Sequence, residues 1–244
     1  MGGWGEFAQR GPRGLAQLVG LALWGRRDWV ILARWLDNFA PPTPRASGPA
    51  LSFRTMARAD IEAVAALLPR HLTHLPRKAR RAWVADMLDR GEPARVACLD
   101  GEVVAAVWLP PATDDNARLL DAAVGSPAGA TFRQVVKLVT APRCRGAGIA
   151  GSLLARGMED LAQQGVRGMV SVIGEQNIAS LKVHLRLGFG LLQVHRSRWR
   201  LGLRRIRMDR DSEICDCLGF ARWTPHNSAS LPVSSIDFSP SRPS

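Results

Sequence analysis

The chain has 244 residues, which suits one medium domain with extensions or two small domains. Its 33 Lys and Arg residues against 21 Asp and Glu give a formal charge of +12, which favours anionic partners such as phosphates, nucleic acid or an anionic membrane surface. Tyrosine is absent, so a tyrosine phenol is excluded as a catalytic acid or base.

Cysteine spacing and early hydropathy bear on location. The four cysteines show no recognisable zinc spacing, so we predict no metal site, and they indicate a reducing compartment. No secretory signal is evident. The longest early apolar run, 14–24, is shorter than the roughly 20 residues that span a bilayer. We therefore expect a cytoplasmic protein.

Residues 1–50 are expected to form an amphipathic helical extension that ends in a Pro-rich linker. Apolar residues recur at helical spacing over 15–23 and again over 30–36. The prolines of 41–49 cannot continue a helix. Tryptophans among arginines leave two interpretations open for residues 13–38, which are peripheral contact with a membrane and packing on a partner or on the chain's own domain.

A folded α/β domain is expected over residues 51–201, followed by a basic and Pro/Ser-rich tail, 202–244, that is partly disordered. An Asp-Gly pair between two apolar runs predicts a hairpin. The expected segments are strand 51–55, helices 61–68 and 76–90, hairpin strands 94–99 and 102–109, helix 117–124, strand 132–140, helix 149–164, strand 166–173, helix 177–187 and a final strand or hairpin over 189–201.

The strongest motif joins the end of the 132–140 strand to the helix that follows. It reads Arg143-Cys144-Arg145-Gly146-Ala147-Gly148. Small residues let backbone amides approach an anion, and the helix N-terminus adds the positive end of its dipole, so the motif indicates a bound phosphate or pyrophosphate. The lack of Gly-Lys-Ser/Thr excludes a nucleoside-triphosphate P-loop. Gly146, Gly148 and Gly151 supply a dinucleotide spacing, but the acid expected after the next strand has no clear candidate.

A second segment runs from Asn177 to Leu187-Gly188-Phe189. Together the two segments resemble the paired cofactor motifs of GNAT acetyltransferases, in which Arg-x-x-Gly-x-Gly precedes an Asn and a helix that closes in Leu-Gly-Phe. The resemblance covers about residues 51–201. It implies a mixed, mostly antiparallel central sheet flanked by helices, here with the helical N-terminal extension added.

The resemblance implies acetyl-CoA as co-substrate, with its pyrophosphate on the loop amides. A backbone amide of Val139 or Thr140 would polarise the thioester carbonyl. Asn177 would contact the pantetheine or a bound water, although it could also simply cap the next helix. The implied cofactor-binding residues are Val139, Thr140, Arg143, Cys144, Arg145, Gly146, Ala147, Gly148, Ile149, Ala150 and Asn177.

His184 stands where many members of this family place a Tyr that protonates the departing thiolate. The resemblance therefore implies that His184 is the catalytic acid, and a structural histidine is the alternative. No general base is identifiable. The carboxylates considered for it are Glu102, Asp114, Asp115 and Glu175, each of which also suits a turn or a solvated position. His71 and His74 could line an acceptor site or end a helix.

The function expected first is acetyl transfer to an amine of a small molecule or protein, and a hydroxyl acceptor stays open. The second hypothesis is a non-catalytic acyl-CoA-binding sensor or scaffold. The third is a basic adaptor for a membrane surface or nucleic acid, which would use residues 1–50 or the arginine run 196–210. No nucleic-acid motif accompanies that run, so we expect no nucleic-acid partner.

Overall fold

The computed structural model describes residues 26–37, 39–40, 51–68, 76–124, 131–200 and 203–223. Within this part of the chain, the strands form one sheet in the order β2-β3-β4-β5-β6-β1-β7-β8. The strands are β1 (Arg26–Trp35), β2 (Leu51–Thr55), β3 (Ala94–Leu99), β4 (Glu102–Trp108), β5 (Phe132–Thr140), β6 (Gly168–Gly174), β7 (Gly190–Arg200) and β8 (Leu203–Asp209). The α-helices are α2 (Ile61–Leu67), α4 (Arg77–Asp89), α5 (Asp114–Val124), α6 (Ile149–Gln163), α7 (Ile178–Arg186) and α8 (Glu213–Leu218).

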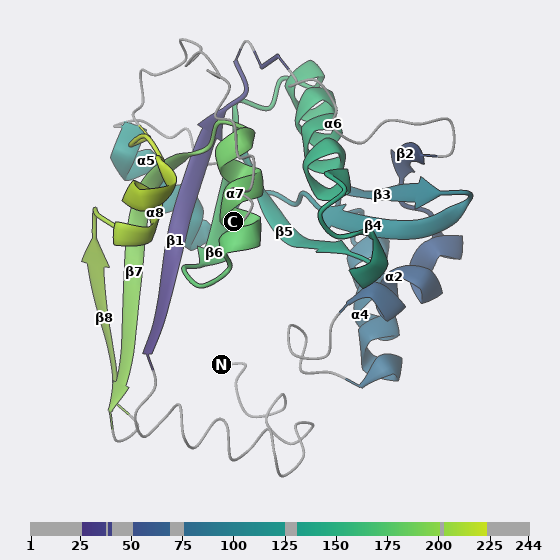
Figure 1. Cartoon of the computed structure of the whole chain (residues 1–244), viewed down its shortest axis with the longest axis horizontal. Coiled ribbons are helices and arrows are strands. Elements are labelled where there is room, and N and C mark those ends of the chain that lie inside the picture. The colour runs from purple at the N-terminus through teal and green to yellow at the C-terminus, as the bar shows by residue number, and fades with distance from the viewer. Residues whose placement is uncertain are drawn as a thin grey trace, which may run out of the picture.

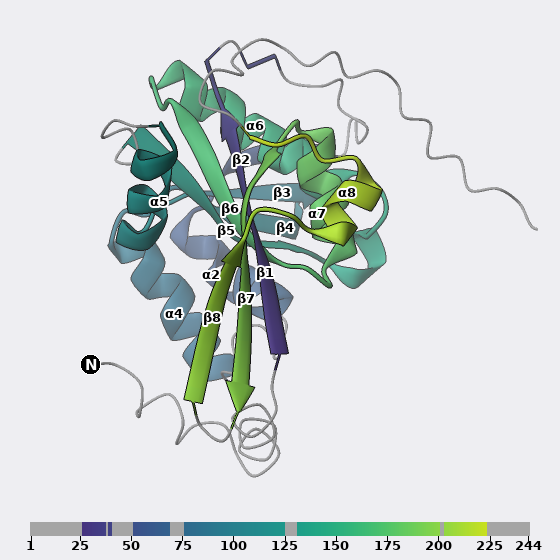
Figure 2. The ribbon, with the colours of Figure 1, turned by 90° about the vertical axis from the view of Figure 1, so that its left-hand side faces the viewer.

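Helices cover both faces of the sheet, as Figures 1 and 2 show. Helices α6, α7 and α8 lie on one face and share a core with the sheet residues Val30, Leu32 and Val135. Helices α2 and α4 pack on the other face of β3, β4 and β5. Helix α5 packs on that same face where β1, β5 and β6 meet. The sheet is therefore the middle layer of three.

Most elements expected between residues 51 and 201 are confirmed. The Asp-Gly turn joins β3 to β4, and Asp100 and Gly101 adopt φ of 50° and 80°, as a two-residue hairpin turn requires. Helix α5 begins at Asp114 rather than at 117. Among the pairings of the named strands, only β5 with β6 is parallel. The mixed, mostly antiparallel sheet is thus as expected.

The helical prediction for residues 30–36 is wrong. These residues belong to β1 and the turn after it, and β1 lies between β6 and β7 and pairs antiparallel with both. Val30 to Ala33 are at most 1% exposed. A strand covered on both faces is apolar at every position, and such a run also satisfies a helical period. Residues 30–33 therefore offer no surface to a membrane or partner, and residues 13–25 lie outside the described part.

The boundary expected at residue 201 is also wrong, because the chain is folded as far as Trp223. Strand β8 extends the sheet beside β7, and Ser212 caps α8 by accepting a hydrogen bond from the Cys215 amide at 3.3 Å. Trp223 stacks on Trp35 with ring centroids 5.3 Å apart. Strand β8 lies at the sheet edge and is rich in arginine, so its sequence lacks the apolar pattern by which a buried strand is predicted. Residues 224–244 lie outside the described part.

We expect Gly168→Ala to lower the melting temperature. The added Cβ would lie 2.3 Å from the ring of Phe132 and 2.8 Å from the carbonyl oxygen of Arg34. The Phe132 ring is held edge-on against Trp35, so relief is limited, and overpacking of this kind costs about 1–3 kcal/mol. Gly174→Ala is the control on the same strand, since its nearest atom would be 3.8 Å away. Equal melting temperatures for the two variants would contradict this packing.

Candidate functional site

The central feature of the sheet is the divergence of β5 from β6. Strand β5 pairs with β6 only from Phe132 to Val135, and its second half pairs with β4. The pairing with β4 shifts register between Val136 and Val139 of β5, and Lys137 in this interval has a φ of 53°. Such a bulge bends a strand, so the carboxyl half of β5 leaves β6 and a wedge opens between them (Figure 1). Burial lowers the pKa of Lys137 at this bend.

The glycine-containing loop follows directly at the end of β5. The amide of Ala141 still donates to the carbonyl of Val104 at 2.8 Å, which holds the start of the loop against β4. A single 3-10 turn, η3 (Pro142–Cys144), comes next. Gly146 and Gly148 then adopt φ of 80° and 79°, a left-handed conformation that side chains other than glycine adopt at a cost. The two glycines are therefore required by the shape of the turn.

The loop presents a run of unpaired backbone donors. None of the amides from Gly146 to Gly151 donates to a carbonyl or side chain of the described residues, and the first helical bond of α6 is from Ser152 to Gly148 at 3.0 Å. No side chain caps α6. Six consecutive free amides at the positive end of a 15-residue helix form a cradle for an anion. We call residues Gly146–Gly151 the amide cradle.

The other predicted loop residues differ in exposure. Cys144 and Ile149 are buried in the core on the α6 face, and Arg145 is exposed. The Arg143 guanidinium lies 2.5 Å from the Glu102 carboxylate, which lowers the pKa of Glu102 and raises that of Arg143. Because both side chains are exposed, water and salt screen this pair, and an anion in the cradle could compete for Arg143. Glu102, one of the carboxylates considered as a base, is thus an exposed hairpin residue.

The second motif meets the first because β5 and β6 are parallel neighbours. The cradle follows the carboxyl end of β5, and Asn177 follows the carboxyl end of β6, so both lie at the same edge of the sheet. Helices α6 and α7, which these segments open, are in contact. The Asn177 side chain accepts a hydrogen bond from the Ser180 amide at 3.2 Å, which confirms the capping interpretation. Its contact with a pantetheine stays a prediction.

The remaining base candidates are engaged or remote from the wedge. Asp114 and Asp115 are exposed in the first turn of α5. Glu175 is buried, and its carboxylate accepts a hydrogen bond from the Ser212 hydroxyl at 2.6 Å. The segment that carries His71 and His74 lies outside the described residues. No carboxylate side chain lies on β5, so the structure adds no residue to the candidates for a base.

His184 is buried inside α7, with 1% of its surface exposed. Its Nδ1 lies 2.8 Å from the Ser180 carbonyl, and its ring packs edge-on against Phe189 with centroids 4.8 Å apart. Burial lowers the pKa of His184 to about 4. At neutral pH the imidazole is therefore uncharged, with Nδ1 donating to the carbonyl. The acid role stays a prediction, and this resting state does not favour it.

The buried imidazole makes stability depend on pH. The pKa of 6.5 in the unfolded chain falls to about 4 on folding, so the unfolded state binds more protons between these values. The contribution is fully present above pH 6.5 and is lost as the pH falls towards 4. Between pH 7 and pH 5 we expect a loss of about 2 kcal/mol. Urea unfolding of the wild type and of His184→Leu at both pH values measures it. An equal pH dependence in the two proteins would refute it.

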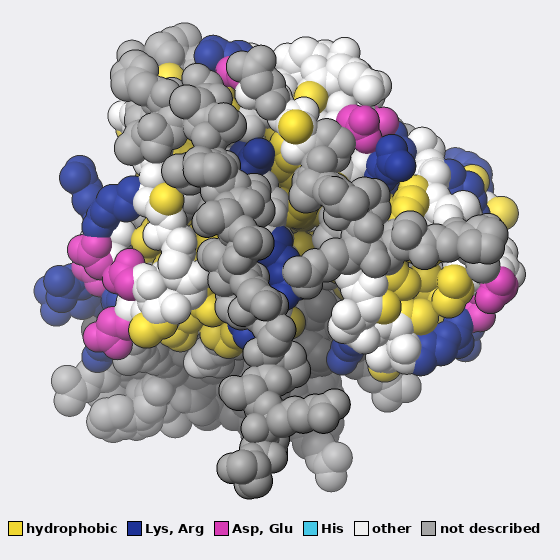
Figure 3. All heavy atoms as spheres, turned by 45° about the horizontal axis from the view of Figure 1, so that its top comes forward, with side chains coloured by type: hydrophobic (Ala, Val, Ile, Leu, Met, Phe, Trp, Pro, Cys, Tyr) yellow, Lys and Arg dark blue, Asp and Glu magenta, His cyan; other side chains and the backbone are white. Residues whose placement is uncertain are grey.

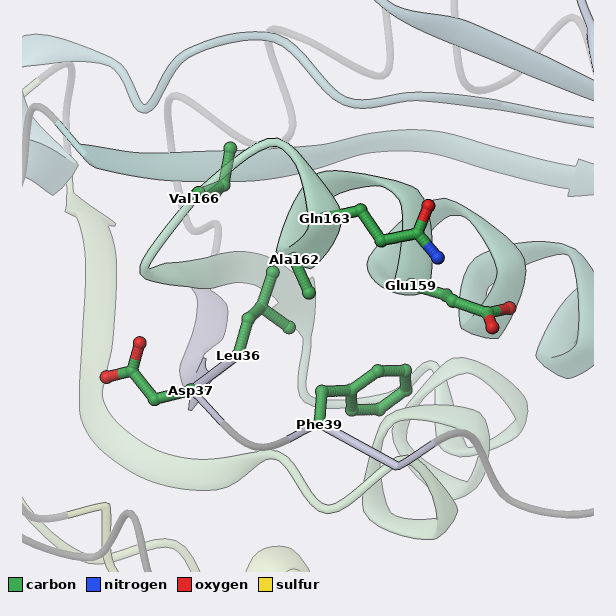
Figure 4. Close-up of a pocket in the computed structure, with 8 residues that line it drawn as sticks. Leu36, Asp37, Phe39, Glu159, Ala162, Gln163 and Val166 are labelled. Carbon is green, nitrogen blue, oxygen red and sulfur yellow. The ribbon is translucent and has the colours of Figure 1, made fainter.

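A separate cavity of about 390 Å³ lies at the other end of α6 (Figure 4). Leu36, Phe39 and Ala162 give it an apolar side, and Asp37 and Glu159 lie at its border. Because it is at the carboxyl end of α6, it is not part of the amide cradle. Among the described residues, no group of three His, Cys, Asp or Glu side chains could hold a metal ion, and no helix is long and apolar enough to cross a membrane.

The parallel strands β5 and β6 diverge, and free amides lie between the end of β5 and α6, which defines an α/β protein with a backbone site suited to an anion. A family model described as the acetyltransferase (GNAT) family matches residues 61–189, which are 129 of the 244 residues. The chain belongs to this family. The match takes in both motifs and leaves β1, β2, β7, β8 and α8 outside.

Two solved structures with TM-scores above 0.5 have a similar fold, and a third is similar at a lower TM-score. A GCN5-related N-acetyltransferase from Sphaerobacter thermophilus is 20% identical with a TM-score of 0.53, over 80% of this chain and 59% of that one. A GCN5-related glucosamine N-acetyltransferase region of a fungal multi-domain β-N-acetylglucosaminidase is 16% identical with a TM-score of 0.54, over 75% of this chain and 22% of that one. YncA from Salmonella typhimurium, a putative acetyltransferase solved with acetyl-CoA, is 21% identical with a TM-score of 0.45, over 57% and 79%. A comparison with curated proteins found no match.

Proposed function

We propose that the chain transfers an acetyl group from acetyl-CoA to an amine of a small molecule or protein. The observation that carries this proposal is the amide cradle at the mouth of the wedge between β5 and β6. Membership of the acetyltransferase family supports the reaction class. YncA, which resembles this chain, was solved with acetyl-CoA as its cofactor.

In this proposal the amides of Gly146 to Gly151 hold the pyrophosphate. Free amides at a helix N-terminus bind phosphate without a further cation, and the helix dipole adds to the attraction. Arg143 and Arg145 bring two guanidinium groups next to the cradle in sequence. Arg143 would exchange its exposed pairing with Glu102 for a phosphate oxygen, since both partners of that pair are mostly in water.

Backbone alternation favours Thr140 over Val139 as the donor to the thioester carbonyl. Successive amides of a strand point to opposite edges, and the Ala141 amide bonds to β4. The Thr140 amide therefore points away from β4, into the wedge, whereas the Val139 amide points to β4. A fixed amide in this position would stabilise the negative charge that develops on the carbonyl oxygen. Acetyl-CoA supplies the activated acyl group.

The proton balance of the reaction does not require an ionised His184. A neutral amine attacks the thioester carbonyl, the carbon–sulfur bond breaks, and the proton lost from nitrogen can pass to the departing thiolate. With a pKa of about 4, His184 is uncharged at neutral pH. We therefore assign it to the packing of α7, and we assign the rate enhancement to positioning and to the Thr140 amide.

Release of free CoA thiol from acetyl-CoA in the presence of a panel of amines tests the proposal. The panel should include small primary amines, amino sugars and peptides with free α-amino groups. Thiol release that depends on one class of amine, with a matching acetylated product, is the expected result. Saturable acetyl-CoA binding without turnover across the panel would overturn the transferase proposal in favour of a binding-only protein.

A further inference from the structure

Arg196 gathers three carboxylates on the α7 and α8 side of the sheet. Its guanidinium lies 2.7 Å from Asp209 of β8, 3.2 Å from Asp28 of β1 and 3.7 Å from Glu175, which follows β6. The Arg196 side chain is only 20% exposed, and those of Asp28 and Glu175 are 7% and 11% exposed. Figure 3 shows basic and acidic side chains next to each other along the edge formed by β7 and β8. We call these four residues the Arg196 cluster.

Glu175 is the member of the cluster that lies next to Asn177, in the turn between β6 and α7. Its Oε1 accepts the Ser212 hydroxyl at 2.6 Å, and its backbone amide donates to the Asp28 carbonyl at 3.0 Å. Ser212 is fully buried, where it also caps α8. Two residues after Glu175, Asn177 opens α7. Three contacts, from β1, β7 and α8, thus hold the short turn that carries Asn177.

The residues that contact Glu175 or Arg196 also share a place in the sequence. Asp28, Arg196, Asp209 and Ser212 all lie outside the residues that the family model matches, 61–189. Glu175 and Asn177 lie within them. The added strand β1 and the C-terminal segment are therefore joined to the family part of the chain at the turn between β6 and α7. A buried carboxylate needs such partners, because without them its desolvation would disfavour this position.

We propose that Glu175 is a positioning residue, through which the Arg196 cluster and Ser212 fix the β6–α7 turn for acetyl-CoA binding. The proposal rests on the function proposed above. It differs from the assignment of Glu175 as a base, because the carboxylate accepts the Ser212 hydroxyl and pairs with Arg196, and these two contacts hold it in place. Loss of its side chain should move the Asn177 turn and weaken cofactor binding without changing the chemical step.

Glu175→Ala tests this in the full chain. Arg196 keeps Asp28 and Asp209 in this variant, so the sheet should remain folded. We expect the KM for acetyl-CoA to rise about fivefold to tenfold, with kcat near the wild-type value. Glu175→Gln keeps the size and can still accept the Ser212 hydroxyl, so it should recover most of the affinity. Arg207→Met is the matched control, since it removes another ion pair of Asp209 that does not touch Glu175.

Hydrogen exchange in the protein without ligand separates this inference from the proposed function. Glu175→Ala should speed exchange at the first amides of α7 and leave α6 unchanged, whether or not acetyl-CoA binds. Unchanged exchange there would overturn the inference even if the wild type acetylates amines. A fall in kcat with unchanged KM would also overturn it, because Glu175 would then act in the chemistry. Should Glu175→Ala fail to fold, Ser212→Ala provides the same two measurements, with the same outcomes expected.

Discussion

Gly146→Glu is expected to weaken acetyl-CoA binding about 100-fold in a folded protein. A Cβ added at Gly146 would meet no atom within 4 Å, so there is open space at this position. Its carboxylate would lie next to the free amides of the cradle and repel a pyrophosphate. Loss of charge-assisted bonds of this kind costs about 3 kcal/mol, or a Kd about 100-fold higher. Equilibrium dialysis with acetyl-CoA measures the effect.

Gly165→Glu is the matched control for this experiment. Gly165 has a φ of 77° against 80° for Gly146, and it too has no atom within 4 Å of an added Cβ. Both variants therefore carry the same backbone strain, about 1–2 kcal/mol, and the same added charge. Gly165 lies at the opposite end of α6. If both variants bind acetyl-CoA equally well, the cradle is not the pyrophosphate site.

Leu32→Asp in β1 is expected to unfold the protein. Leu32 is fully buried in the core that the sheet shares with α6, α7 and α8, and it lies among apolar side chains there. Burying an unpaired charge costs about 4 kcal/mol or more, which is a large part of the 5–15 kcal/mol that stabilises an ordinary domain. Circular dichroism and urea unfolding would show loss of the cooperative transition at 25 °C.

The comparison for that variant is Met208→Asp on the edge strand β8. Met208 is 63% exposed, so its substitution should leave the unfolding transition nearly unchanged. A cooperative transition at the wild-type urea concentration for Leu32→Asp would mean that β1 is not part of the sheet. Residues 1–50 would then be the separate extension that the sequence pattern indicated.

Local signals were sufficient for the part of the site that depends on backbone shape. Gly146 and Gly148 mark the loop because a left-handed turn before a helix favours glycine, and the structure has both at positive φ. Asn177 and Gly188 mark the two ends of α7 for similar local reasons. These features need no knowledge of distant residues, so the sequence reveals them.

Features that depend on pairing between distant segments were not predictable. The apolar run of β1 has the same pattern as a buried helix face, and only its partners β6 and β7 decide between the two. The partners of Glu175 are 147 residues earlier at Asp28 and 37 residues later at Ser212, counted from the residue numbers. The low pKa of His184 likewise follows from its burial. The position of His184 in the motif, where the family often has a Tyr, gives no information on that burial.

The most direct test of the central claim is calorimetric titration of the wild-type protein with acetyl-CoA at two temperatures. The account predicts saturable binding of one acetyl-CoA per chain, held by the amides of Gly146 to Gly151. The absence of saturable binding at both temperatures, in a protein that unfolds cooperatively, would contradict it.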